Sequence, residues 1–260
     1  MTTIAFTLDN AVTLAQETAM FVVMGIVFVT GIVRGFSGFG SGMIIGPSTA
    51  AIFSPLTSLA MLTILDALPT LTLVWGARKN VVWREVLPIL FGYALFVPLG
   101  VWVLKTGDPI ALRWFISISI LIAVAILWSG WKYTGSRSAP VSFSFGGLGG
   151  FMGAAAALPG PPVLVYWLAS TAKAISIRAN MIYYLFLTDL IVIVGYIFGD
   201  IYTVESVLRG LICVPVYFVG ILIGARFFSA ASETVYRTVA FVFILCSAII
   251  SLPLLDSIIR

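Results

Sequence analysis

The stretch that decides the fold reads RGFSGFGSGMIIGP, from Arg34 to Pro47. It is a glycine- and serine-rich interruption of an otherwise apolar region, and a single arginine opens it. A second interruption, GGFMGAAAALPGPP, runs from Gly149 to Pro162. Glycine and proline both disfavour a regular helix, proline most strongly. The two segments therefore predict two broken helices, and we expect the fold to bring them face to face.

The composition places both breaks in a membrane protein. Of the 260 residues, 61% are hydrophobic and 9% are charged, whereas roughly a quarter of the residues of a soluble domain are charged. Long apolar runs predict helices, because a transmembrane barrel shows short alternating segments instead. We therefore expect an all-α, multi-pass membrane protein, with the lipid bilayer as its first partner.

The residue types exclude several functions. The chain has no histidine, which excludes His-ligated metal sites and His-based catalytic triads. We predict no metal, no cofactor and no enzymatic activity; a membrane-embedded enzyme or assembly factor is the weakest alternative. The net charge of +4 comes from cations that flank apolar runs. This is typical of the positive-inside rule, so we expect no nucleic-acid partner.

The second half of the chain repeats the first. The duplication predicts a first repeat over residues 1–131, a cytoplasmic linker over 132–140 and a second repeat over 141–260. The matched pairs are Gly35 with Gly150, Gly38 with Gly153, Asp66 with Asp189 and Gly100 with Gly224, at offsets that rise from 115 to 124 residues.

Loop charges predict that the two repeats are inverted in the membrane. The loop with Arg78, Lys79 and Arg84 is basic, and its counterpart with Asp200 and Glu205 is acidic. Because basic loops stay in the cytoplasm, equivalent loops lie on opposite faces. Inverted repeats with broken helices are typical of transporters, whose substrate site lies near the midplane. We expect about 8–10 helical membrane segments, the broken ones either spanning or re-entrant.

Arg34 is the most informative single residue. A charge at membrane depth costs about 2.5–3.5 kcal/mol on insertion scales, so it usually faces a polar cavity or a partner. Arg34 either snorkels to an interface or pairs with Asp66, or it binds a carboxylate or sulfonate through paired donors. Asp66 and Asp189 are either structural partners or proton-coupling groups, and the second interpretation makes H⁺ a coupling ion.

We predict that both breaks contribute to one binding site. Glycines spaced four residues apart allow close helix packing, and they also let backbone N–H groups approach an anion. Serine hydroxyls add hydrogen-bond donors. Tyrosines such as Tyr183 and Tyr184 are more often core aromatics than ligands. The predicted substrate-binding residues are Arg34, Ser37, Gly38, Phe39, Gly40, Ser41 and Gly42, then Pro159, Gly160, Pro161 and Pro162, and finally Tyr183 and Tyr184.

These motifs resemble a known family. The segment from Arg34 to Gly42, followed by Pro47, resembles the first repeat of the TauE/SafE sulfite/organosulfonate exporter family. The segment from Ala157 to Pro162 resembles the second-repeat counterpart, although alanines stand at 154–157 where the family often keeps glycine. The resemblance implies a bacterial inner-membrane carrier that moves small sulfur-containing anions, usually outward.

We therefore expect a secondary transporter of small anions. The transported anion is expected to be a sulfonate such as sulfoacetate, or sulfite, exported by alternating access. The alternative is an anion channel, or an importer of small carboxylates or inorganic sulfur anions. The sequence leaves the oligomeric state open, including a homo-oligomer.

Overall fold

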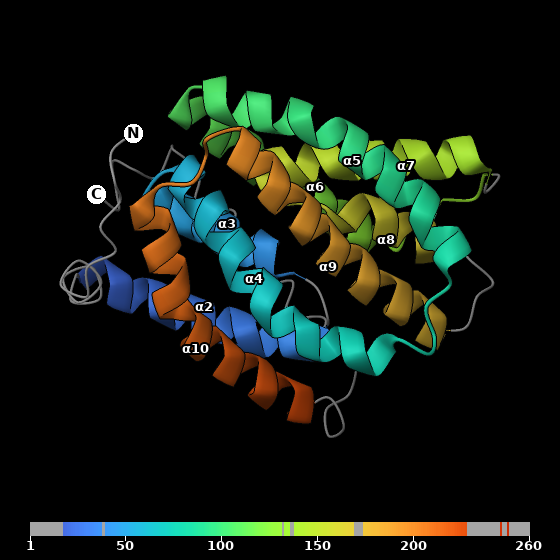
Figure 1. Ribbon diagram of the computed structural model, residues 1–260, viewed down its shortest axis with the longest axis horizontal. Helices are drawn as coiled ribbons and strands as arrows, with labels where there is room; N and C mark the ends of the chain where they lie inside the picture. The colour runs from blue at the N-terminus through green and yellow to red at the C-terminus, as the bar shows by residue number, and fades with distance from the viewer. Residues whose placement is uncertain are drawn as a thin grey trace.

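The computed structural model describes residues 18–37, 40–131, 133–135, 138–168 and 174–227, together with positions 245 and 249. Within these residues the chain is helical and contains no strand, so the predicted all-α fold is confirmed (Figure 1). The helices are α2 (Thr18–Ser37), α3 (Ser41–Ile52), α4 (Pro55–Ala77), α5 (Trp83–Thr106), α6 (Pro109–Ser129), α7 (Ala139–Ala156), α8 (Gly160–Leu168), α9 (Ala174–Phe198) and α10 (Val204–Phe227).

Five of the described helices are long and apolar enough to cross a membrane: α2, α5, α6, α9 and α10. Helix α5 illustrates the apolar side chains that cover the outer surface of the protein. Phe91, Leu95 and Trp102 all project outward and are more than half exposed. Soluble monomers rarely leave so large an apolar surface uncovered. The structure therefore confirms the prediction of a multi-pass membrane protein.

Local sequence signals set the ends of the helices. Asp108 caps α6, because its Oδ1 atom accepts the backbone N–H groups of Ile110 and Ala111 at 3.0 and 2.9 Å. Pro109 follows at the first helical position, where proline lacks only an N–H that the helix does not use. At the other end Gly130 has φ 69°, a left-handed conformation that glycine adopts without strain and that ends the helix.

Contacts between turns identify the two ends of the helix bundle. Asn180, near the start of α9, accepts the N–H of Val82 at 2.7 Å and donates to Glu85 at 2.9 Å. Asp200, just after the end of α9, lies 3.5 Å from the ammonium of Lys105. The α4–α5 turn and the α9–α10 turn therefore lie at opposite ends of α9 (Figure 1). The loop charges predict this placement, although the inversion of whole repeats stays a prediction.

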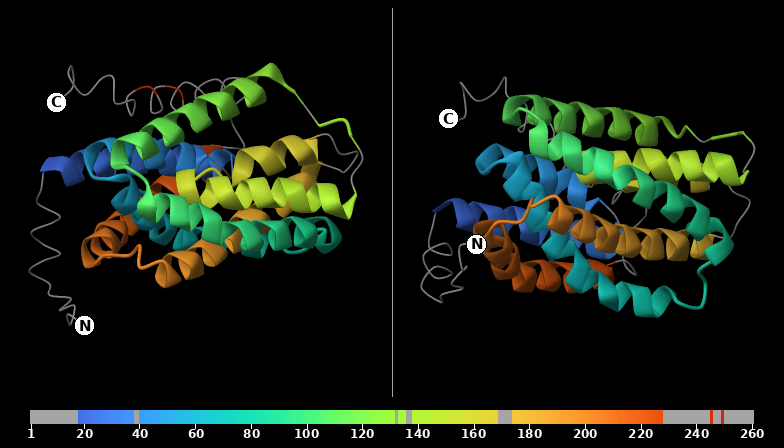
Figure 2. Two further views of the ribbon diagram at one scale, coloured as in Figure 1. Left: turned by 90° about the horizontal axis from the view of Figure 1, so that it is seen from above. Right: turned by 45° about the horizontal axis from the view of Figure 1, so that its top comes forward.

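Two helix–break–helix units enter the bundle from opposite ends. The unit α2–α3 begins at the same end of the bundle as the α9–α10 turn, and the unit α7–α8 begins at the same end as the α4–α5 turn (Figures 1 and 2). Helix α2 packs along α10, and α7 packs along α5. Glycines make both contacts: Gly31 and Gly35 lie on the backbone of Tyr217 and Ile221, and Gly146 and Gly150 lie on the backbone of Ile89 and Tyr93.

Both breaks are shorter than predicted. Helix α7 continues to Ala156, so the stretch from Gly149 onward is helical until Ala157. Its glycines do not interrupt it, because close packing against α5 offsets their poor helix propensity. The segment Gly160–Pro162 is also helical and forms the first turn of α8, where proline is tolerated. The second break thus comprises only residues 157–159.

The first break is similarly compact. Helix α2 continues past Arg34 to Ser37, and α3 starts at Ser41 and includes Pro47. Gly40, directly before α3, has φ 98°, which an L side chain rarely adopts. Gly38, Phe39, parts of the 132–140 linker, the N-terminal lead-in and nearly all of the last expected helix lie outside the described residues.

Candidate functional site

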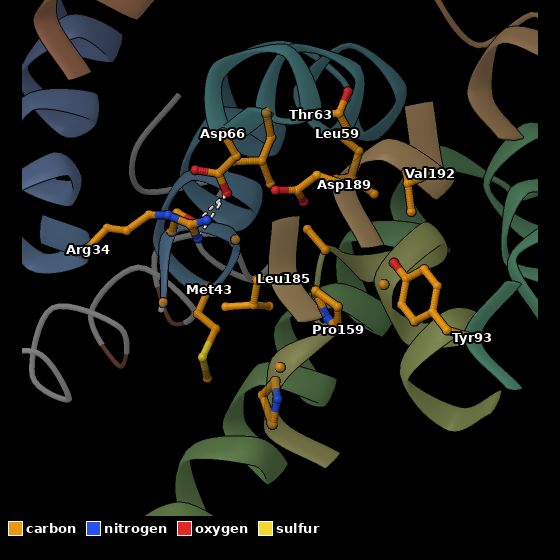
Figure 3. A pocket seen from close by; sticks show the side chains of 18 of the residues that line it. Arg34, Met43, Leu59, Thr63, Asp66, Tyr93, Pro159, Leu185, Asp189 and Val192 are labelled. Atoms are coloured by element: carbon orange, nitrogen blue, oxygen red, sulfur yellow. Dashed lines mark hydrogen bonds and ion pairs between the residues drawn. The ribbon is translucent and has the colours of Figure 1, made fainter. Parts of the chain in front are cut away.

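A cavity lies where the two breaks meet (Figure 3). The breaks touch each other directly, because Gly42 packs against the carbonyl group of Ala157. Ala157 has φ 57°, so the chain turns there in a left-handed conformation that alanine adopts only at some cost. The residues at the breaks and in the helix starts that follow them line the cavity: Gly40, Ser41, Gly42 and Met43 at the first, and Ala157, Pro159, Gly160 and Pro161 at the second.

Arg34 reaches this cavity from the last turn of α2 and is only 3% exposed. Its Nη1 atom lies 3.2 Å from Oδ2 of Asp66 and donates to the Ser41 hydroxyl at 2.7 Å. Its Nη2 atom donates to the Thr70 hydroxyl at 3.0 Å. One of the two interpretations of Arg34, an ion pair with Asp66, is therefore present in the structure. Its Nε atom is buried and has no hydrogen-bond partner among the described residues.

Both oxygens of the Asp66 carboxylate bind donors, which come from three other helices. Besides Arg34 from α2, the Ser41 hydroxyl of α3 donates to Oδ2 at 2.5 Å. The Tyr217 hydroxyl of α10 donates to Oδ1 at 2.5 Å. Charge-assisted hydrogen bonds of this kind are about twice as strong as neutral ones. Asp66 is thus the hub of a buried network that joins α2, α3, α4 and α10.

Two helix N-termini open onto the cavity. Helix α3 begins at Ser41, and its N-cap residue Gly40 has no side chain that could cap it. Helix α8 begins at Gly160, but Pro161 and Pro162 follow and carry no N–H. An uncapped helix N-terminus attracts anions through its free N–H groups and its dipole. The α3 end offers more donors than the α8 end, so the cavity is electrostatically asymmetric.

Asp189 contrasts with Asp66. It lies on α9 and lines the same cavity, where its side chain reaches toward Asp66 (Figure 3). Its Oδ2 atom is buried and has no hydrogen-bond partner among the described residues. Arg34 is the only cation among the described residues that line the cavity. The two matched aspartates therefore have different surroundings.

Some predicted site residues lie away from the cavity wall. The Tyr184 hydroxyl donates to the Pro159 carbonyl at 2.9 Å, so this residue supports the second break from behind. Tyr183 packs edge-on against Trp83, with ring centroids 5.2 Å apart, outside the cavity lining. Pro162 is also outside the lining. The backbone of Ser37 ends α2, and its side chain is outside the described set.

Several cavity residues escaped the sequence prediction. Thr63, Tyr93 and Tyr196 line the cavity, and Tyr217 holds Asp66. A signal for one pair was present: Tyr93 and Tyr217 are 124 residues apart, which is the offset between Gly100 and Gly224. Thr63 and Tyr196 carry no comparable signal, because threonine and tyrosine are common in membrane helices.

Comparison with known proteins agrees with this geometry. The family model described as "Sulfite exporter TauE/SafE" matches residues 23–250, a range that contains both breaks. The chain belongs to the TauE/SafE family. No curated protein and no solved structure gives a significant match. As a TauE/SafE member with five described helices that are long and apolar enough to cross a membrane, the chain is a multi-pass transporter of the cell membrane.

Proposed function

We propose that this TauE/SafE protein exports a small sulfonate such as sulfoacetate, or sulfite, and binds it in the cavity between the two breaks. The observation that carries the proposal is Arg34, a buried cation on the cavity wall with an unused Nε donor. An exported dianion also gains from the inside-negative membrane potential, about 2.3 kcal/mol per charge per 100 mV.

The proposed contacts are asymmetric. A sulfonate accepts two parallel hydrogen bonds from a guanidinium, as a carboxylate does. The N–H groups in the first turn of α3 and the Ser41 hydroxyl complete the shell on the same side. The α8 side contributes Gly160 and the proline rings, which form a largely neutral wall. The anion competes with Asp66 for Arg34, so binding has to loosen this ion pair.

Alternating access between inverted halves is the proposed mechanism, and the glycine contacts support it. Gly92 of α5 lies on the backbone of Phe143 in α7, and Gly220 of α10 lies on the backbone of Phe28 in α2. Phe28 and Phe143 are 115 residues apart, the offset that relates Gly35 to Gly150. The two glycines are 128 residues apart, one helical turn more than the 124 residues between Gly100 and Gly224. Similar interfaces of this kind are what a pair of related halves would produce.

Side-specific labelling tests the inverted arrangement. In a protein with Cys213→Ala and Cys246→Ala, we expect Lys79→Cys to react with a membrane-impermeant maleimide only from the cytoplasmic side. Thr203→Cys should react only from the opposite side. Both positions are exposed in turns that follow α4 and α9. Labelling of both from one side would contradict inversion.

Transport by purified protein in liposomes tests the function itself. We expect saturable flux of labelled sulfoacetate or sulfite, and in Arg34→Lys a rise of about tenfold or more in KM, because an ammonium cannot form the paired contact. Arg84→Lys is the matched control, since Arg84 is exposed in the first turn of α5, away from the cavity lining. A purely structural role of Arg34 would leave KM unchanged and lower only the amount of folded protein.

The same assay separates the alternative functions. Flux that does not saturate, with currents that follow the electrochemical gradient, would assign the chain to anion channels. Preferential inward movement of carboxylates of similar size would assign it to importers. Either result would leave Arg34 as the anion contact but would overturn export.

A further inference from the structure

We propose that Asp189 is the proton-binding residue of the transport cycle, while Asp66 stays ionised as the counter-ion of Arg34. The inference rests on the proposed function. It gives the two aspartates different roles, whereas the sequence gives both the same possible roles. It implies that one proton moves together with each transported anion.

The contacts of Asp66 stabilise its charged form. Both of its oxygens accept hydrogen bonds from hydroxyl groups, and Oδ2 also pairs with Arg34. A carboxylate that accepts several hydrogen bonds beside a cation binds a proton poorly. Asp66 is therefore a poor site for a proton that has to be taken up and released in each cycle.

Asp189 has the opposite environment. Its Oδ2 atom is buried on the cavity side of α9 without a hydrogen-bond partner in the described part of the chain. A carboxylate oxygen that is buried without a partner carries a desolvation cost in the charged form, and protonation removes this cost. Because Arg34 already pairs with Asp66, no second cation of the described lining is available to balance Asp189.

The internal repeat explains why the two acids differ. At the offset of 115 residues, Gly149 stands where the first repeat has Arg34, and Ala156 stands where it has Ser41. The second repeat has thus kept the aspartate without its cation and its hydroxyl donor. Gly149 also leaves no space for a cation, since an added Cβ would lie closer than 3.0 Å to the Tyr184 hydroxyl.

The neighbours of Asp189 on every packed element are consistent with this role. Helix α7 carries no titratable side chain, and α8 carries only Tyr166, whose hydroxyl bonds to Ser142 at 2.7 Å. The remaining groups comprise one cation, one acid and several neutral phenols. They are Arg34 of α2, Asp66 of α4, Tyr93 of α5, Tyr184 and Tyr196 of α9, and Tyr202 after α9.

The coupling follows from charge. With Asp189 protonated, Arg34 and Asp66 leave the cavity neutral, and an incoming anion meets no uncompensated negative charge. With Asp189 ionised, the anion is repelled. Anion and proton therefore bind more tightly together than either does alone, and the effect is reciprocal. A dianion that leaves with one proton still carries one negative charge outward, which the membrane potential favours.

Binding of sulfoacetate to the purified protein between pH 6 and 9 tests the inference. Both acid groups of this probe are ionised throughout, because a carboxyl group titrates at about 4 and a sulfonic acid is stronger still. We expect the wild-type affinity to fall with rising pH by up to about tenfold per pH unit. Asp189→Asn should bind independently of pH with the wild-type low-pH affinity, and Asp66→Asn should retain the dependence on pH.

A second measurement does not need the anion. Asp189→Asn removes the charge from a carboxylate whose Oδ2 atom is buried without a partner among the described residues, so its thermal unfolding temperature at pH 8 should equal or exceed that of the wild type. Asp66→Asn leaves Arg34 without its counter-ion and should unfold at a lower temperature. The reverse order would overturn the assignment.

Each outcome of the binding experiment decides one question. If the pH dependence survives in Asp189→Asn, or disappears only in Asp66→Asn, the inference is wrong while the proposed function stands. If replacing Na⁺ by choline weakens wild-type binding, a metal cation rather than a proton is coupled, and the inference is also wrong. If no small sulfur anion binds at any pH, the proposed function itself is overturned.

Discussion

Gly42→Ala is expected to lose transport almost completely, whereas Gly46→Ala, one turn further along α3, is expected to keep it. An added Cβ at Gly42 would lie closer than 3.0 Å to the carbonyl oxygen of Ala157. At Gly46 the nearest atom would be the Ala157 Cβ at 3.6 Å, an ordinary contact. A backbone carbonyl at a break cannot rotate away as a side chain can, so the two breaks must separate.

The pair of variants controls for helix propensity. Both replace a glycine inside α3 by alanine, which favours the helix by about 1 kcal/mol at either position. Overpacking at Gly42 should offset this gain, at a cost of about 1–3 kcal/mol. The measurement is the initial rate of sulfoacetate flux in proteoliposomes at equal amounts of folded protein. Equal rates for the two variants would show that the contact between Gly42 and Ala157 does not matter for transport.

Arg34→Ala is expected to be strongly destabilising, by about 3–5 kcal/mol, because it leaves the buried Asp66 carboxylate without its cation. The double variant Arg34→Ala/Asp66→Asn should recover most of this loss. The carbonyl oxygen of the introduced amide can still accept a hydrogen bond from Ser41 or Tyr217, and no charge remains unpaired. The double variant should nevertheless fail to bind or transport the anion.

Thermal unfolding of the purified variants, together with anion binding, checks this cycle. Recovery of stability without recovery of binding separates the structural role of Arg34 from its role as the anion contact. If the double variant is as unstable as the single one, the buried network depends on more than this ion pair. If the double variant transports normally, Arg34 does not contact the substrate.

The first break shows how far a sequence prediction reaches. Arg34 attracts attention because a lone charge in an apolar run is rare, and Gly40 because glycine permits the left-handed turn seen there. The second break shows the limit. Its glycines were expected to interrupt a helix, yet Gly150 and Gly153 lie within α7 and against Tyr93. Glycine spacing alone cannot tell an interruption from close packing, because both need a missing side chain.

The sequence by itself determined the class of the protein. Membrane helices follow from composition, and the duplication, the loop charges and the approximate position of the breaks follow from local residue types. These properties depend on each segment alone and do not require knowledge of its neighbours.

Only the tertiary structure decided which of the polar residues act together. It joins Asp66 to Tyr217 across 151 positions of the chain, and it places Gly42 on Ala157. It also gives Asp66 and Asp189 different surroundings, although the repeat makes them equivalent. Asp66 is surrounded by donors, and Oδ2 of Asp189 has no partner among the described residues. The physical reason is that burial and hydrogen bonding are set by which helices pack together, and many packings are compatible with the same apolar pattern.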